Sequence, residues 1–181
     1  REQECAKNFR EYIATTHLEH LIYLSGIVNE DKLSPHLLSR KLVEDELREG
    51  PYHFTVLRAG IIVGSGSASF EIIRDLVEKL PVMIAPRWLR TRCQPIAIAD
   101  VIQLLSLSLL KEATYDEVFD IGGPDVLSYK EMLLGFAEVR GLKRYIFTLP
   151  VLSPRLSSYW LFFVTSTSYN LAVALVDSMK V

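Results

Sequence analysis

The sequence predicts an α/β protein in which helices cover both faces of a parallel sheet. Short apolar runs alternate along the chain with longer segments whose apolar residues recur every three or four positions. This alternation is typical of strands that are joined by crossover helices. The chain has 181 residues, of which 49% are hydrophobic and 23% charged, so it is long enough to bury one core of ordinary size.

The first half of the chain begins with a helical pattern. The expected order is a helix near residues 4–15, a strand at 20–25, a helix from 35 to about 48, a strand at 54–63 and a helix from 69 to 80. Ser34 and Pro35 favour a helix start, because Ser caps free amides and Pro fits the first helical position. Gly50 ends that helix. The last helix of this half carries one apolar face, formed by Phe70, Ile73, Val77 and Leu80.

The second half continues the alternation with weaker signals. We expect extended pieces at residues 82–85 and 95–98, an apolar helix at 101–110 and a strand at 117–121. Ser128 and Glu131 have the spacing of a capping box, which predicts a further helix that Gly141 closes. After Arg144 the alternation becomes unclear.

Composition argues against several kinds of partner and site. The formal net charge is -2 and no basic block is present, so nucleic acid is disfavoured as a partner. Cys5 and Cys93 lie in no CxxC motif. We therefore expect free thiols that are buried or half-buried, no metal site and a reducing, cytoplasmic location.

One segment raises the question of a membrane. Residues 156–176 carry no charge and are long enough to cross a bilayer. Their centre, residues 165–170, is polar, which is costly inside lipid. A buried or partner-facing segment is favoured, and a membrane-associated protein stays as an alternative.

Ligands of parallel α/β sheets bind where the strands end at their carboxyl termini. The residues at these positions are Ser25-Gly26, Arg58-Ala59-Gly60 and Gly122-Gly123. A loop with Gly64, Gly66 and Ser69 comes close to the glycine fingerprint that cradles a dinucleotide pyrophosphate. However, no acidic ribose-binding residue follows it about twenty positions on, and a strand–helix unit already precedes it. We interpret this loop as part of the substrate side.

Several blocks of the chain match a known family in order. They are "IYLSGI", "SPHLLSRKLVEDELRE", "FTVLRAGIIVGSGSASFEII", "QPIAIADVIQLL" and "FDIGGPDVLSYKEML". Together they resemble the latter half of an atypical or extended short-chain dehydrogenase/reductase, of the NAD-dependent epimerase/dehydratase-like or complex I accessory-subunit-like group. "LSPRLSSYWLFFVT" is also similar to the C-terminal region of that group. The resemblance covers nearly the whole chain and implies a Rossmann-like fold.

The resemblance implies roles for individual residues. Ser25 matches the family's catalytic serine, while His36 and Arg40 stand where the family has a Tyr-x-x-x-Lys pair. The implied cofactor-binding residues are Ser25, Gly26, Arg40, Arg58, Ala59 and Gly60. The implied substrate-side residues are Gly64, Gly66, Arg87 and Gln94. Histidine can move a proton near neutral pH, and arginine keeps its charge and can hold a ribose hydroxyl or a phosphate.

The resemblance also implies NAD or NADP as cofactor and a small-molecule substrate of unknown identity. The expected activity is that of an oxidoreductase or a sugar-nucleotide epimerase/dehydratase. The family's glycine-rich loop belongs to a first strand–helix unit that we expect to be missing from this chain. Because the Tyr/Lys pair is replaced, a non-catalytic nucleotide-binding accessory or redox-sensing module is the alternative, and a homo-oligomer is left open.

The expected domain division follows from the same resemblance. Residues 1–143 would form the C-terminal portion of an NAD(P)-binding domain, with substrate-side segments interleaved at about 64–98. Residues 144–181 would form a small substrate-side or partner-facing region.

Overall fold

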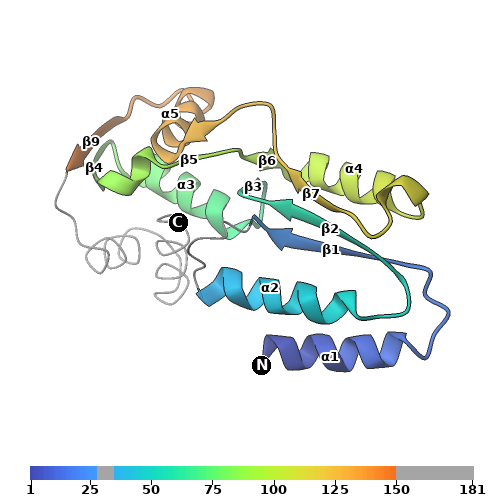
Figure 1. The fold of residues 1–181 in the computed structure, drawn as a ribbon. Helices are drawn as coiled ribbons and strands as arrows, with labels where there is room; N and C mark the ends of the chain where they lie inside the picture. Colours follow the sequence, from blue (N-terminus) through green and yellow to red (C-terminus); the bar gives the residue numbers. More distant parts are fainter. Residues whose placement is uncertain (28–34, 150–181) are drawn as a thin grey trace. The chain divides into compact units, whose positions relative to one another are not determined.

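A computed structural model describes residues 1–27 and 35–149, apart from the side chains of Pro35, His36, Trp88 and Leu149. The chain forms two compact units (Figure 1). Unit 1 contains Arg1–Gly60 and Ile96–Gly122, and unit 2 contains Ile61–Pro95 and the described residues from Gly123 onward. We describe each unit by itself.

Unit 1 holds the main parallel sheet. Its elements are α1 (Glu2–Ile13), β1 (His20–Gly26), α2 (Pro35–Arg48), β2 (His53–Ala59), β6 (Ile96–Ala97), α4 (Ile98–Ser108), the 3-10 helix η2 (Glu112–Thr114) and β7 (Val118–Ile121). The sheet has the order β1-β2-β7, and both strand pairs are parallel. In Figure 1, α1 and α2 lie on one side of this sheet and α4 on the other. The expected α/β architecture is therefore confirmed.

Alternation along the strands decides which side chains meet α1 and α2. Phe54 and Val56 of β2 are almost fully buried, and they pack with Ala6 of α1 and Leu47 of α2. Side chains two positions apart share one face of a strand. Arg58 therefore lies on this same face, at the carboxyl end of β2.

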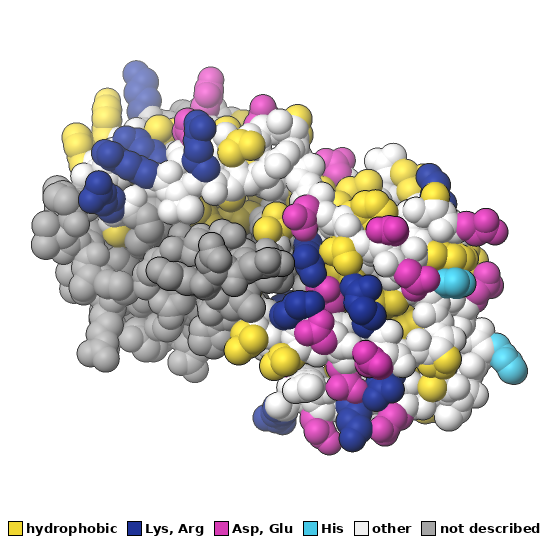
Figure 2. Space-filling view, in the orientation of Figure 1, with side chains coloured by type: hydrophobic (Ala, Val, Ile, Leu, Met, Phe, Trp, Pro, Cys, Tyr) yellow, Lys and Arg dark blue, Asp and Glu magenta, His cyan; other side chains and the backbone are white. Residues whose placement is uncertain are grey.

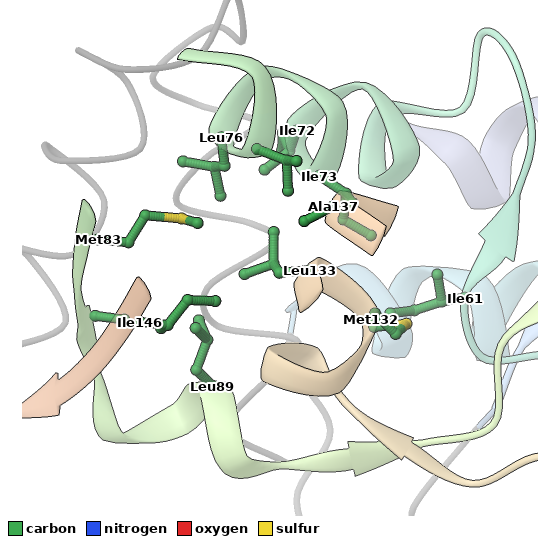
Figure 3. Packing of buried hydrophobic residues seen from close by; sticks show 12 residues of the cluster. Ile61, Ile72, Ile73, Leu76, Met83, Leu89, Met132, Leu133, Ala137 and Ile146 are labelled. Atoms are coloured by element: carbon green, nitrogen blue, oxygen red, sulfur yellow. The ribbon is translucent and has the colours of Figure 1, made fainter. Parts of the chain in front are cut away.

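Unit 2 is built around two helices. Its elements are β3 (Ile62–Val63), α3 (Ala68–Lys79), β4 (Val82–Pro86), the 3-10 helix η1 (Arg87–Arg90), β5 (Arg92–Cys93), β8 (Leu127–Ser128), α5 (Tyr129–Val139) and β9 (Tyr145–Leu149). β4 pairs with β9 in parallel and β5 with β8 antiparallel. Leu133 of α5 lies in the middle of the core, among Leu76 of α3, Met83 of β4 and Ile146 of β9 (Figure 3).

Two local expectations differ from the structure, and one strand lies where no element was predicted. The apolar run at 54–63 is not one strand, because β2 ends at Ala59 and β3 begins at Ile62. The chain passes from unit 1 to unit 2 after Gly60, and the expected strand ran across this point because apolar residues continue on its far side. The following helix has Ser67 rather than Ser69 as its N-cap. The strand β9 lies where the sequence pattern was unclear.

Other local signals are confirmed. Ser128 caps α5 in a capping box, with the Glu131 N–H donating to its Oγ at 3.2 Å and the Ser128 N–H donating to Glu131 Oε2 at 2.6 Å. Gly141, just past α5, has a φ of +66°, as expected for a glycine that ends a helix.

The two cysteines differ from each other. Both are free thiols, but Cys5 is exposed, so the expectation of burial is wrong for it, while Cys93 is half-buried. Cys5 lines an open groove and is accessible there, whereas Ala6 beside it packs into the core. Burial raises the pKa of the Cys93 thiol.

Two sequence-based expectations fall largely on residues 150–181. Among the described residues, no helix has the length and apolar character needed to cross a bilayer. The uncharged segment 156–176 lies outside those residues, as does most of the expected region 144–181. The division at residue 143 and the cytoplasmic location therefore stay predictions.

Candidate functional site

The carboxyl ends of three parallel strands bring together the residues at the edge of the unit 1 sheet. The register places Ser25 beside Arg58 and Arg58 beside Asp120. One position further on, Gly26 lies beside Ala59. The sequence-predicted residues of β1 and β2 are therefore neighbours at the edge where ligands of such sheets bind.

Ser25 is the unusual member of this row. Its side chain is 5% exposed, and its Oγ is buried without a hydrogen-bond partner among the described residues. A buried hydroxyl without a partner costs about 1–3 kcal/mol, so native proteins keep few of them without a reason. Among the described residues, Ser25 is therefore the one residue of this row whose buried hydroxyl has no hydrogen-bond partner.

Arg58 is engaged by a carboxylate of α2. Its Nη2 donates to Glu44 Oε1 at 2.7 Å and its Nε donates to Glu44 Oε2 at 3.2 Å. This hydrogen-bonded carboxylate raises the pKa of the Arg58 guanidinium. Because the guanidinium faces α2, the backbone of Ala59 and Gly60 is the part of this segment that remains for a ligand. The Ala59 carbonyl also accepts a hydrogen bond from the Ile27 N–H at 3.2 Å.

The start of α2 lies against the end of β1. A Cβ atom on Gly26 would come within 3.1 Å of Leu37 Cδ2, so a side chain there would push against the first turn of the helix. His36 occupies that first turn. Its side chain lies outside the described part of the chain, so its predicted role stays a prediction.

Arg40, one helical turn after His36, lies on an open groove. The groove has a volume of about 550 Å³. Phe9 of α1, Tyr23 of β1 and Val43 of α2 line it together with Arg40. Tyr23 and Ser25 share one face of β1 because they are two positions apart. Arg40 thus offers a positive charge on the same side of the sheet as Ser25.

The predicted substrate-side residues Gly64, Gly66, Arg87 and Gln94 belong to unit 2. Gly66 has a φ of +83°, a conformation that glycine adopts without strain. Its N–H donates to Glu71 Oε1 at 3.4 Å. A carboxylate at the start of α3 repels an anion from the place where a phosphate would bind. This arrangement supports the interpretation that the loop is not a phosphate cradle.

The other two residues of this set lie on short extended and 3-10 segments. Gln94 is exposed, and its Nε2 donates to the Gly123 carbonyl at 2.5 Å. Arg87 begins η1 and is exposed to solvent. Their proposed role toward a substrate stays a prediction.

Sequence reasoning missed Glu44 and Asp120. Glu44 is fully buried although it carries a charge, and it lies between Val43 and Leu47 on a helix whose apolar side packs on the sheet. A charged residue beside the apolar positions of a helix is a signal that could have identified it. Asp120 gave no such signal, because only the strand register shows that it is a neighbour of Arg58.

Metal chemistry has no support in the described ranges. Within residues 1–27 and 35–149, no three His, Cys, Asp or Glu side chains lie close enough to hold a metal ion. A dinucleotide, by contrast, binds at an apolar strand edge that has small residues and a few polar groups. The strand ends of unit 1 have small residues, namely Gly26, Ala59 and Gly60, and a polar group in Ser25.

Comparison with known proteins supports the fold. No protein-family model matches the sequence, and no curated protein matches it. The chain is similar to the UDP-glucuronic acid 4-epimerase of Bacillus cereus in complex with UDP-glucuronic acid and NAD, with 17% identity, a TM-score of 0.64, and coverage of 99% of this chain and 67% of that one.

Two further solved structures give the same result. The NADPH-dependent quinone oxidoreductase QOR2 of Escherichia coli, complexed with NADPH, is 15% identical with a TM-score of 0.74, covering 96% of this chain and 58% of that one. A short-chain dehydrogenase/reductase superfamily protein of Agrobacterium tumefaciens with bound NAD is 13% identical with a TM-score of 0.63, covering 99% and 72%. The chain thus spans between 58% and 72% of these proteins. It shares the Rossmann-like α/β fold of these three proteins.

Proposed function

We propose that this protein binds NAD or NADP at the carboxyl edge of the β1-β2-β7 sheet and acts as an oxidoreductase or sugar-nucleotide epimerase/dehydratase. The observation that carries the proposal is the buried hydroxyl of Ser25 at the end of β1, which has no hydrogen-bond partner in the described part of the chain. Proteins of the same fold have been solved with NAD, NADPH and UDP-glucuronic acid. A ligand at this edge would provide the hydrogen-bond partner that residues 1–27 and 35–149 do not give to the Ser25 hydroxyl.

Each candidate residue of unit 1 has a separate role in this proposal. The Ser25 hydroxyl donates a hydrogen bond to the oxygen of the carbonyl or alcohol that reacts. His36 moves the proton to or from that oxygen, since an imidazole titrates near neutral pH. Arg40 holds a ribose hydroxyl or a phosphate oxygen, while the backbone of Ala59 and Gly60 forms the wall beside the nicotinamide. The nicotinamide, when bound, supplies or takes up the hydride.

Calorimetric titration with NADH and with NADPH tests the binding step. We expect saturable binding of at least one of the two dinucleotides. Absence of binding for both, in protein whose circular dichroism shows the folded state, would overturn the proposal.

The replacement of the family's Tyr/Lys pair by His36 and Arg40 favours a second candidate, a nucleotide-binding accessory or redox-sensing module without catalysis. The two candidates differ in turnover. Consumption of NADPH with a quinone, or conversion of a UDP-sugar, that is lost in His36→Phe would exclude the second candidate. Binding without turnover of either kind of substrate would favour it.

A further inference from the structure

Glu44 is a fully buried carboxylate in the middle of α2. The outer surface of α1 and α2 carries Lys and Arg side chains interspersed with Asp and Glu (Figure 2), and exposed ion pairs of this kind add little to stability. Glu44 differs from them because it has no access to solvent. Removing a carboxylate from water carries a large desolvation cost, so its partners must compensate for that cost.

Three cations provide this compensation. Arg58 makes the two-point contact at 2.7 and 3.2 Å. Arg48 Nη2 lies 3.5 Å and Lys41 Nζ 3.7 Å from Glu44 Oε1. The contact with Arg58 differs from the other two because it joins α2 to a strand of the sheet. Two parallel hydrogen bonds between a guanidinium and a carboxylate fix the relative orientation of both groups.

The strand position of Arg58 gives this contact its importance. Arg58 is the next-to-last residue of β2 and lies beside Ser25 in the register. The Ile27 N–H···O=C Ala59 hydrogen bond closes the same edge one position further on. α2, in turn, carries His36 and Arg40 on its first turns. The Glu44–Arg58 pair thus joins the helix with these two residues to the strand end beside Ser25.

We propose that Glu44 is a positioning residue that holds α2 at a fixed distance from the carboxyl ends of β1 and β2. Its consequence for ligand binding rests on the dinucleotide-binding function proposed above. Glu44 touches no ligand in this proposal. It acts through Arg58, and it keeps Ser25 and the start of α2 in the geometry that a dinucleotide requires.

The same helix offers a matched control. Arg10 Nε and Nη2 donate to Glu46 Oε1 at 3.1 and 2.9 Å. This pair is also a guanidinium–carboxylate contact, although the Glu46 side chain is 16% exposed, and it joins α2 to α1 and not to the sheet. Glu46→Gln therefore breaks a comparable ion pair without touching the strand ends.

The first experiment compares hydrogen exchange in the protein without added ligand. Wild type, Glu44→Gln and Glu46→Gln are measured well below the unfolding transition of each. We expect the amides of Ile27 and residues 57–60 to exchange about tenfold faster or more in Glu44→Gln, and at the wild-type rate in Glu46→Gln. Unchanged exchange in Glu44→Gln, or an equal increase in both variants, would overturn the positioning role.

The second experiment measures NADH and NADPH affinity of the same three proteins by calorimetry. Glu44→Gln should bind about tenfold more weakly, while Glu46→Gln should stay within about twofold of wild type. Equal affinity in wild type and Glu44→Gln would contradict the effect on the site. If wild type binds neither dinucleotide, the proposed function fails, and the exchange comparison alone still decides the role of Glu44.

A conservative variant covers the case in which Glu44→Gln does not fold. Glu44→Asp keeps the negative charge but shortens the side chain by one methylene, which separates the carboxylate from the Arg58 fork. It should fold and still show the faster exchange at Ile27. Wild-type exchange in folded Glu44→Asp would overturn the proposal.

Discussion

Two small hydroxyl side chains in neighbouring strands of unit 1 have opposite surroundings. Thr55 of β2 is fully buried, accepts a hydrogen bond from His20 Nε2 at 2.8 Å and donates to the Thr114 carbonyl. Ser25 of β1 is buried as well but has no partner among the described residues. Thr55 therefore contributes two hydrogen bonds to the fold, whereas the Ser25 hydroxyl contributes none that the described residues show.

Substitution of these two residues should give opposite results. Ser25→Ala should leave the free energy of unfolding within about 1 kcal/mol of wild type or raise it, because it removes a buried hydroxyl that has no partner among the described residues. It should weaken dinucleotide binding about tenfold. Thr55→Val should destabilise the protein by about 1–3 kcal/mol. Urea unfolding and calorimetry measure these effects, and a loss above about 2 kcal/mol in Ser25→Ala would contradict this assignment.

His20 forms a buried network at the opposite end of the sheet. Its Nδ1 accepts a hydrogen bond from the Leu110 N–H at 3.0 Å, so its Nε2 is the nitrogen that carries the proton and donates to Thr55. The ring is therefore neutral. Burial, followed by the nearby charge of His53, lowers the pKa of His20 in the folded protein.

This lowered pKa predicts a pH dependence of stability. In the unfolded chain His20 takes up its proton near pH 6.5, while in the folded protein it does so only at lower pH. The unfolded state therefore binds more protons in this window, and the stabilisation present above about pH 6.5 is lost as the pH falls toward the folded pKa. Urea midpoints at several pH values measure the effect.

His20→Gln is the matched variant for this measurement. Its amide can donate to Thr55 and accept from Leu110, but it does not titrate. The loss of stability between about pH 7 and 5 should be smaller in His20→Gln than in wild type. An identical pH dependence in the two proteins would exclude His20 as its source.

At the scale of single elements, the sequence predicts the first residue of a unit 2 helix correctly where a side-chain cap is present. Ser128 and Glu131 satisfy each other's free amides at the start of α5. At the start of α3, by contrast, Ser67 makes no side-chain cap, and its hydroxyl donates instead to the Ile62 carbonyl at 2.7 Å. The expected N-cap was Ser69. The turn ends at Gly66, so the N-cap of α3 is Ser67, two residues earlier.

Removal of the α5 cap should have a measurable cost. Ser128→Ala leaves the Glu131 N–H without its acceptor and should lower the free energy of unfolding by about 1 kcal/mol. Ser106→Ala is the control, since its exposed hydroxyl only donates back to the Ile102 carbonyl within α4 and its loss should change stability by less than about 0.5 kcal/mol. Urea unfolding of both variants provides the comparison, and equal effects would show that the capping box adds nothing.

Elements also show which parts of the site could be predicted. Strand ends are local features, so Ser25, Gly26 and the segment Arg58–Gly60 could be identified from the sequence. The engagement of the Arg58 side chain by Glu44 could not, because the two residues belong to a strand and a helix whose contact depends on packing. The same holds for the neighbouring position of Asp120, which only the strand register determines.

On the scale of the whole molecule, each unit has its own apolar core. The core of unit 1 contains Phe54, Val56 and Leu47, and the core of unit 2 contains Leu76, Leu133 and further side chains of α3, α5, β4 and β9. Helices α1 and α2 contribute side chains to the first core, and α3 and α5 contribute side chains to the second. Local stability should therefore follow the core to which an element belongs.

Large-to-small substitutions in the two cores test this expectation. Leu133→Ala and Leu47→Ala should each cost about 2–5 kcal/mol. We expect Leu133→Ala to accelerate amide exchange mainly in α3 and α5, and Leu47→Ala mainly in α1, β1 and β2. Hydrogen exchange followed by mass spectrometry resolves these segments. A uniform increase along the whole described chain for both variants would show that the two cores unfold together.

The sequence by itself determined the order and type of most elements and the α/β class, because periodicity, caps and turn residues act over a few neighbouring positions. Only the tertiary structure decided which side chains form a row across β1, β2 and β7, that Ser25 has no hydrogen-bond partner among the described residues, and that Glu44 is buried among three cations. These properties depend on strand register and on contacts between residues far apart in the chain, and no local pattern contains them.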